Sequence, residues 1–214
     1  LLRHDLFMSK TDISIDQIKS ALRQYCGNQK TSDFDLNEAS RPSSHQLRRA
    51  AVLLPLILRP SGINIILTKR SNHLKNHPGQ IALPGGKFDG DDKNFIDTAL
   101  REAEEEIGLS QSIVNILGTL PDHETVTSFC VTPVVGLINT TFEPKLDRNE
   151  VDEVFEVPLS IFTDSKNFNI HDRMWNGIKR QYFVVPYGPY YIWGATARIL
   201  RMFCDVIGGH NEIN

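Results

Sequence analysis

The residues with the clearest chemical potential are four glutamates within five positions, preceded by a glycine-bearing loop. The glutamates belong to the segment Arg101-Glu102-Ala103-Glu104-Glu105-Glu106, and the loop contains Gly85-Gly86. Like charges three and four residues apart on a helix repel one another and destabilise it. A hard divalent cation bound through oxygen atoms would relieve that repulsion and could receive a diphosphate. The pattern therefore indicates a metal site for phosphate chemistry.

Helical geometry separates these glutamates into two groups. At about 100° per residue, Glu105 and Glu106 lie within about 60° of Glu102, whereas Glu104 points to the opposite side. Ligands that offer only oxygen favour Mg²⁺ or Mn²⁺ over zinc, so we predict that Glu102, Glu105 and Glu106 bind one of these ions. A solvated acidic face is the alternative for any such run of charge. An apolar stripe beside the three carboxylates should face the core, formed by Ile96, Ala99, Ala103 and Ile107.

The residues around the glutamates have predicted supporting roles. Arg101 lies beside Glu105 on the helix, so it can orient the carboxylates by pairing with Glu105 or with an aspartate upstream. We therefore group Arg101 with the catalytic residues, in a positioning role. Gly108 follows the last helical residue, as expected for a helix C-cap.

These residues resemble the motif of the Nudix hydrolase family. That motif is Gly, five residues, Glu, seven residues, and then Arg-Glu-apolar-x-Glu-Glu-x-Gly-apolar. Gly86 opens the motif here, and Arg101 to Leu109 match every specified position of its second half. The resemblance implies a metal-dependent hydrolase with an α/β/α sandwich fold, in which the backbone carbonyl of Gly86 is a further metal ligand.

The first half of the motif departs from the family pattern in two ways. Asp92 stands where the family has its first Glu, and one extra residue separates Gly86 from Arg101. Asp89 and Asp91 are alternatives for the structural role of this acidic position.

A second resemblance, to the coenzyme A diphosphatase branch of that family, lies just before the motif. Its residues are Leu67-Thr68-Lys69-Arg70-Ser71, Lys75, Gly79-Gln80 and Pro84-Gly85-Gly86. It implies hydrolysis of coenzyme A or acyl-CoA to 3′,5′-ADP and (acyl-)4′-phosphopantetheine. Substrate-binding roles follow for Arg70, Lys75, Gln80 and Gly85, since arginine suits bidentate phosphate contacts. The alternatives are a Nudix diphosphatase for ADP-ribose or another nucleoside diphosphate derivative, and a catalytically idle nucleotide-binding module.

The residue that activates water is left open by the sequence. A general base must reach the attacking water, and the candidates are Glu105 itself and the loop acids Glu124, Glu150 and Glu153. His123 is a weaker candidate, because a lone histidine is more often structural. For Trp193 we expect a place in the core, with stacking on adenine as the alternative.

Composition limits the classes of partner and compartment. The chain has 214 residues, 40% of them hydrophobic, and a net charge of −3, so one domain with a sizeable core is expected and a global basic field for nucleic acid is not. Three widely spaced cysteines argue against a disulfide framework and suit a reducing compartment. Neither a membrane-spanning run nor a secretory signal is recognisable. We expect a cytoplasmic enzyme with a small-molecule substrate, without nucleic-acid or membrane partners; a homodimer is compatible with the sequence.

Alternation and turn residues predict an α/β domain with a mixed sheet flanked by helices. We expect an N-terminal helix and polar linker in 1–45, the hydrolase domain in 46–208 and a tail in 209–214. The predicted helices are 13–26, 95–107 and 196–207, and the segment 28–45 is expected to be a polar loop. The predicted strands are 51–58, 63–69, 80–83, 113–120, 130–138, 151–157, 180–185 and 190–193.

Overall fold

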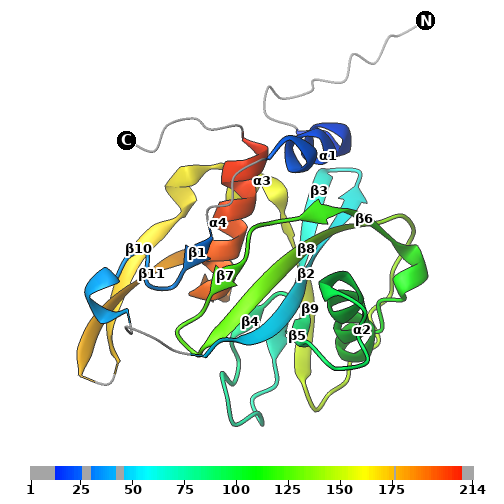
Figure 1. The fold of residues 1–214 in the computed structure, drawn as a ribbon. Coiled ribbons are helices and arrows are strands. Elements are labelled where there is room, and N and C mark those ends of the chain that lie inside the picture. Colours follow the sequence, from blue (N-terminus) through cyan, green and yellow to red (C-terminus); the bar gives the residue numbers. More distant parts are fainter. Residues whose placement is uncertain (1–12, 26–29, 42–45, 176, 209–214) are drawn as a thin grey trace, which may run out of the picture.

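The computed structural model describes residues 13–25, 30–41, 46–175 and 177–208. Its main sheet is built around the hairpin of β2 (Arg48–Arg59) and β3 (Gly62–Arg70), at the place that the turn residues predict. β8 (Phe129–Ile138) runs parallel to β2, and β9 (Val151–Pro158) runs antiparallel to β3. The sheet is therefore mixed (Figure 1). Five shorter strands complete it: β1 (Thr31–Ser32), β4 (Ile81–Ala82), β5 (Gly85–Lys87), β6 (Val114–Thr119) and β7 (His123–Glu124).

Helices cover both faces of this sheet. Alternation along β2 sends Leu54 and Leu56 into one apolar core and Leu53 and Ile57 into the other, because successive side chains of a strand point to opposite faces. α2 (Phe95–Ile107) packs on the second core. The first core lies under α1 (Ile15–Gln24), α3 (Leu159–Thr163) and α4 (Ala195–Ile207). The predicted α/β class with a mixed sheet between helices is confirmed.

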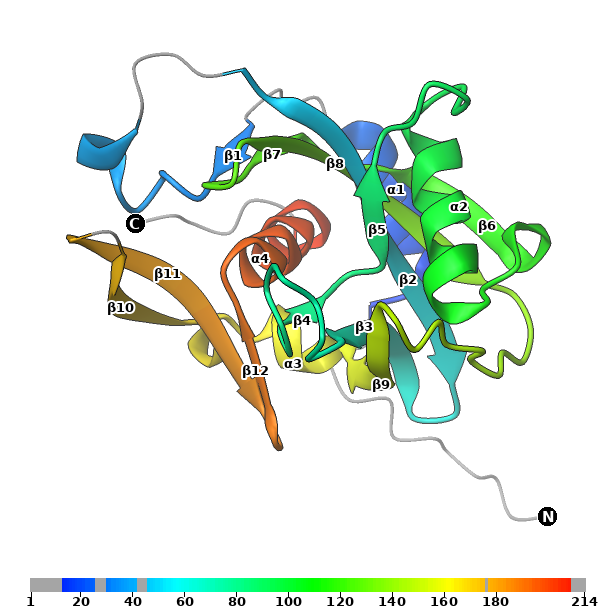
Figure 2. The ribbon, with the colours of Figure 1, turned by 90° about the horizontal axis from the view of Figure 1, so that it is seen from below.

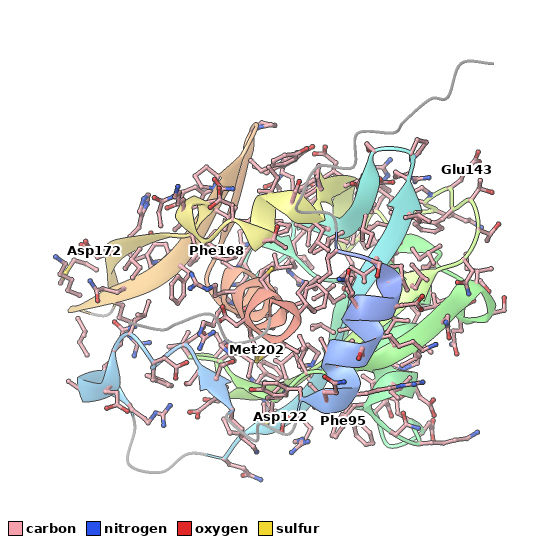
Figure 3. The ribbon with its side chains drawn as sticks, turned by 90° about the horizontal axis from the view of Figure 1, so that it is seen from above. Phe95, Asp122, Glu143, Phe168, Asp172 and Met202 are labelled. Atoms are coloured by element: carbon pink, nitrogen blue, oxygen red, sulfur yellow. The ribbon has the colours of Figure 1, made fainter. Side chains whose placement is uncertain are left out.

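A second, three-stranded sheet lies on the far side of α4 from the main sheet, as Figures 2 and 3 show. It consists of β10 (Asn169–Trp175), β11 (Ile178–Tyr187) and β12 (Tyr190–Trp193), paired antiparallel in that order. Met202, labelled on α4 in Figure 3, contacts β1 through its sulfur, 3.6 Å from the Thr31 hydroxyl. α4 thus joins the two sheets.

The segment 28–45, expected to be a polar loop, differs from that expectation in its described part. It contains β1, which pairs in parallel with β7, and a 3₁₀ helix, η1 (Glu38–Ser40). Thr31, Ser32 and Phe34 are buried. Polar residues can be buried here because partners in β7 satisfy their hydrogen bonds. Two further short 3₁₀ helices are η2 (Gln111–Ile113) and η3 (Ser165–Asn167).

The sequence did not predict α3 and β10, nor the short strands β1, β5 and β7. The expected tail 209–214 lies outside the described residues. Among the described helices, none combines the length and apolar character that crossing a membrane requires. Cys130 and Cys204 are both free thiols.

Candidate active site

Local capping signals fix the helix that carries the glutamates. The Asn94 side chain accepts hydrogen bonds from the backbone N–H groups of Ile96 and Asp97, at 2.8 and 3.0 Å, so α2 begins there. It ends at Gly108, whose φ of 72° is left-handed. Ala99 and Ala103 are fully buried against the sheet, so the predicted apolar stripe is confirmed. Its orientation sets the direction of every glutamate.

Glu106 is the most deeply buried of the four glutamates, with 4% of its surface exposed. Burial raises the pKa of Glu106 to about 8. The charge of Arg70 opposes this shift, whereas the charges of Glu150 and Glu102 add to it. The backbone N–H of Gly85 donates to the Glu106 carboxylate at 3.3 Å. Glu106 therefore sits among like charges that a cation would neutralise.

Glu102 and Glu104 face different environments. Burial raises the pKa of Glu102, Arg101 lowers it, and Glu105 and Glu150 raise it further. Glu104, by contrast, is exposed and accepts a hydrogen bond from Gln111 at 3.1 Å. Glu104 thus points away from the carboxylate face, as helical geometry predicts.

Arg101 organises the carboxylates from one side. Its guanidinium binds both oxygens of Asp92, at 2.9 and 3.0 Å, and also donates to Glu102 at 3.0 Å and Glu105 at 3.1 Å. Asp92, rather than Asp89 or Asp91, therefore fills the structural position of the motif despite the extra residue. A bidentate pair of this kind is among the strongest charge-assisted contacts in proteins, and it holds the pKa of the Asp92 carboxyl well below its usual range.

Position 86 lies so close to Glu102 that a glycine is required there. A Cβ atom at this position would overlap the Glu102 carboxyl group. The absence of a side chain lets the backbone of β5 approach the carboxylate, as a site shared by a carbonyl and a carboxylate requires. The neighbouring Gly85 has a φ of 155°, and a Cβ there would overlap the Ala51 carbonyl.

The carboxylate face, defined as Glu102, Glu105 and Glu106, suits a hard divalent cation in donor chemistry. In their present conformations, the described side chains of His, Cys, Asp and Glu include no group of three or more arranged around a metal position. Arg101 binds oxygens of Glu102 and Glu105 in this arrangement. The Glu105 side chain is 60% exposed, so it has room to turn from Arg101 toward an ion. The positive charge of an ion held by the buried carboxylates would attract this side chain.

A cavity of about 700 Å³ adjoins this face. Arg70, which lowers the pKa of Glu106 by its charge, is one of the lining residues. Lys87 is another, and its carbonyl accepts a hydrogen bond from Arg101 at 3.2 Å. From there the cavity reaches the second sheet, on the other side of the molecule from α2 in Figure 2. Six cationic side chains and one carboxylate line it: Arg48, Arg70, Lys87, Arg173, Arg180, Arg198 and Asp33.

The four residues predicted to bind substrate occupy different positions. Arg70 and Gln80 line the cavity, and the Arg70 Nε is buried without a hydrogen-bond partner. Lys75 is exposed and is not one of the cavity-lining residues. Gly85 does not line it either, and its N–H donates to the Glu106 carboxylate at 3.3 Å.

The candidates for the general base are also separated by the structure. Glu153 on β9 accepts a hydrogen bond from the Tyr190 hydroxyl, and Glu124 lies on β7, beside β1. Glu150 is exposed, and its charge raises the pKa values of both Glu102 and Glu106. Its backbone carbonyl accepts a hydrogen bond from Ser71 at 2.8 Å, which holds it next to Arg70.

His123 is structural in this fold. Its side chain is fully buried between Thr31, whose hydroxyl is 2.9 Å from Nδ1, and Asp33, whose carboxylate is 3.2 Å from Nε2. Burial on its own would raise the pKa of Asp33, but the His123 hydrogen bond and charge lower it. This contact fastens β1 to β7 at one wall of the cavity.

Sequence reasoning missed most of the cations in the cavity. Arg173 and Arg180 lie on the second sheet and Arg198 on α4, far along the chain from the motif. The expectation that Trp193 belongs to the core is wrong, because it is only partly buried and lines the cavity. No spacing rule identifies these residues, since strand pairing and helix packing bring them together.

Sequence comparisons with known proteins identify relatives of this chain. The sequence model of the NUDIX domain family matches residues 47–176. The chain is 41% identical over 161 residues to an uncharacterized Nudix hydrolase NudL of Enterobacter sp. (strain 638), which spans 75% of this chain and 83% of that protein. It is 42% identical over 154 residues to the protein of the same description in Yersinia pestis (strain Pestoides F), over 72% of this chain and 77% of that one.

Solved structures of this kind are more distant. The MutT protein from Methanosarcina mazei Go1 is 26% identical, with a TM-score of 0.44 over 56% of this chain and 83% of its own. An Ap4A hydrolase from C. elegans is 19% identical, with a TM-score of 0.46 over 52% of this chain and 80% of its own. The family match and the curated relatives, together with the Arg101–Leu109 motif on α2, show that this chain belongs to the Nudix family of hydrolases, which act on phosphorus-containing anhydrides.

Proposed function

We propose that this enzyme hydrolyses the diphosphate of coenzyme A or acyl-CoA. The observation that carries the proposal is the cavity beside the carboxylate face, which six cationic side chains and one carboxylate line. One of the six, Arg198, is paired with Asp35 at 3.0 Å, and positive charge is still in excess. The cavity volume of about 700 Å³ lies in the range of pockets for nucleotide-sized ligands. Such an excess of positive charge suits a substrate with more phosphate groups than the diphosphate alone. The resemblance of residues 67–86 to the coenzyme A diphosphatase branch supports the same substrate.

The carboxylate face and the Gly86 carbonyl are the proposed ligands of Mg²⁺ or Mn²⁺. A cation bound there would neutralise part of the charge of the diphosphate and make water a better nucleophile. Arg70 and Lys87 would offset the remaining charge of the diphosphate from the cavity side. The oxygen of the attacking water forms a new bond to one phosphorus, the bridging P–O bond breaks, and the bridging oxygen leaves with the other phosphoryl group. The products are 3′,5′-ADP and (acyl-)4′-phosphopantetheine.

Glu150 is the acid best placed to accept the proton of the attacking water. It is exposed, yet its charge is felt by Glu102 and Glu106, whereas the Glu153 carboxylate is occupied by Tyr190. We expect Glu150→Gln to lower kcat by about 10²-fold, a usual loss for a general base, with KM little changed. Glu124→Gln is the comparison on β7. A larger loss of kcat in Glu153→Gln than in Glu150→Gln would reverse the assignment.

A substrate panel tests the proposed function directly. Coenzyme A, acetyl-CoA, ADP-ribose and a dinucleoside polyphosphate are compared with Mg²⁺ and with Mn²⁺, and the products are resolved by mass. We expect the two coenzyme A compounds to have the highest kcat/KM, without release of inorganic phosphate. In ¹⁸O-water one product alone should carry the label, because water attacks a single phosphorus. A higher kcat/KM for ADP-ribose would show that the branch assignment is wrong.

A further inference from the structure

One end of the cavity lies far from the carboxylate face and carries its own group of cations and rings. We call it the distal end and define it by Arg173, Arg180, Tyr182 and Trp193, all from the second sheet. Figure 2 shows this sheet and α2 on opposite sides of the molecule. A diphosphate held at the carboxylate face therefore cannot be the group that these arginines meet.

The Arg180 guanidinium packs against a ring, but one of its hydrogen-bond donors has no partner. Its carbon lies 5.2 Å from the centre of the Phe34 ring, and its Nε is buried without a hydrogen-bond partner. The charge of Arg180 lowers the pKa of Asp33, whose oxygens are already bound by His123 at 3.2 Å and by the Val126 N–H at 2.9 Å. A buried donor without a partner costs free energy that an arriving acceptor would recover. The side chain is thus prepared for an anion.

The strand that carries Arg180 is fixed from the other side. The Asn37 side chain binds the neighbouring residue of β11, Gln181, through both its N–H and its carbonyl, at 2.7 and 2.8 Å. Arg180 therefore needs no backbone rearrangement to meet a ligand, and preorganisation of this kind strengthens binding.

Aromatic surface lies next to these cations. The Arg173 guanidinium lies over the Trp193 ring, 4.9 Å from its centre, and Tyr182 meets Trp193 edge to face at 5.3 Å. A planar base can stack on such a surface. An anion and an aromatic base side by side are the two features of a nucleotide phosphomonoester.

We infer that the distal end is a subsite for a ribose phosphomonoester next to its base, read by Arg173 and Arg180 with Trp193. The inference rests on the proposed function, and it identifies the group bound there as the 3′-phosphate and adenine of coenzyme A. The exposed Lys75, for which the sequence predicts a substrate-binding role, does not line the cavity.

Binding of product fragments without metal isolates this subsite from catalysis. Calorimetry in EDTA compares 3′,5′-ADP with 5′-AMP for wild type, Arg173→Gln, Arg180→Gln and Lys75→Gln. We expect wild type to prefer 3′,5′-ADP by about 10- to 100-fold, the range for a hydrogen bond to a charged group. Each of the two distal substitutions should reduce that preference by about tenfold. Arg23→Gln on the exposed surface of α1 removes the same charge outside the cavity. This control should leave the preference for 3′,5′-ADP over 5′-AMP unchanged.

Thermal unfolding of each variant checks that it is folded. Arg180→Lys is a second control. This variant keeps the charge but loses the bidentate fork, so it should recover part of the preference. Arg173→Gln lies on another strand and gives an independent measurement if Arg180→Gln unfolds. The inference is overturned if both distal variants weaken 3′,5′-ADP and 5′-AMP equally, or if Lys75→Gln alone removes the preference.

Steady-state kinetics separate the failure of this inference from failure of the proposed function. If coenzyme A and 3′-dephospho-coenzyme A are hydrolysed with equal kcat/KM, the function stands and the subsite is refuted. If coenzyme A is not hydrolysed but 3′,5′-ADP still binds through Arg173 and Arg180, the subsite stands and the proposed substrate is wrong.

Discussion

At the scale of single residues, the site is a balance between one arginine and several carboxylates. Arg101 binds Asp92 with two hydrogen bonds and reaches Glu102 and Glu105 with its remaining donors. Glu106 has no such contact and is buried, which is why its pKa rises to about 8. The charge that Arg101 leaves uncompensated is the charge available to a cation.

Removing a carboxylate at constant size should separate the four glutamates. We expect Glu102→Gln, Glu105→Gln and Glu106→Gln to lose activity, by about 10²-fold or more for at least two of them, because a main electrostatic contribution disappears. Glu104→Gln is the matched control and should be nearly silent, since Glu104 is exposed on the opposite side of α2. Initial rates at saturating Mg²⁺ or Mn²⁺ measure the effect. Equal losses in Glu104→Gln and Glu105→Gln would contradict the assigned face.

Asp92→Asn should destabilise the protein in a pH-dependent way. The loss of charged hydrogen bonds to Arg101 should cost about 1–3 kcal/mol of the free energy of unfolding at pH 7. Because the Asp92 pKa is lower in the folded state, its contribution is present above the unfolded pKa of about 4 and is lost as pH falls through the folded value. Urea unfolding at several pH values measures this, with exposed Asp91→Asn as control. A difference from wild type that grows on acidification would contradict the pairing.

At the scale of elements, the loop before α2 and the helix itself form one unit. β5 pairs with β2 and brings Gly86 against the carboxylate of Glu102, while Asn94 fixes the start of α2. Close approach of backbone and helix is possible because Gly86 has no side chain. The glycine therefore sets how closely the backbone of β5 approaches the Glu102 carboxylate.

Gly86→Ala should reduce activity without unfolding the protein. Its Cβ would displace the Glu102 carboxyl group, and a displacement of about 1 Å at a reacting centre can cost about 10²-fold in rate. The melting temperature should change little, because the displaced group is the end of a side chain. Gly90→Ala is the matched control, since a Cβ there meets nothing within 4 Å. Full activity in Gly86→Ala would argue against the proposed ligand set.

At the scale of the whole molecule, the cavity exists because segments distant in sequence enclose it. Ser32 on β1 and the following residues Asp33, Leu36 and Asn37 line one wall, the second sheet forms another, and α4 contacts both. His123 and Asp33 fasten the first wall, and Asn37 ties it to Gln181 on β11. Loss of one of these long-range contacts should act on substrate binding before it acts on chemistry.

Asn37→Ala tests this connection between the walls. Two hydrogen bonds to Gln181 are lost, each contributing about 0.5–1.5 kcal/mol. We expect a melting temperature lower by a few degrees, a KM raised several-fold and a kcat that changes less. Asn115→Ala, an exposed asparagine on β6 outside the cavity, is the control. An unchanged KM would mean that the contact does not hold the cavity in its binding form.

The parts of this protein that depend on neighbours along the chain can be predicted from its sequence. Gly108 marks the end of α2 as a C-cap, and the common direction of Glu102, Glu105 and Glu106 follows from a period of 3.6 residues. The hairpin of β2 and β3 follows from alternation and from the turn between them. Such features are local, so a single sequence carries them.

Contacts between residues far apart in the chain became visible in the three-dimensional structure alone. It selected Asp92 over two neighbouring aspartates as the partner of Arg101, and it buried part of a segment that is polar in sequence. Trp193 lines the cavity and does not lie in the expected core. Arginines from the second sheet and from α4 line the same cavity. Strand pairing and helix packing create these contacts through geometry and burial, and no local period or spacing encodes them.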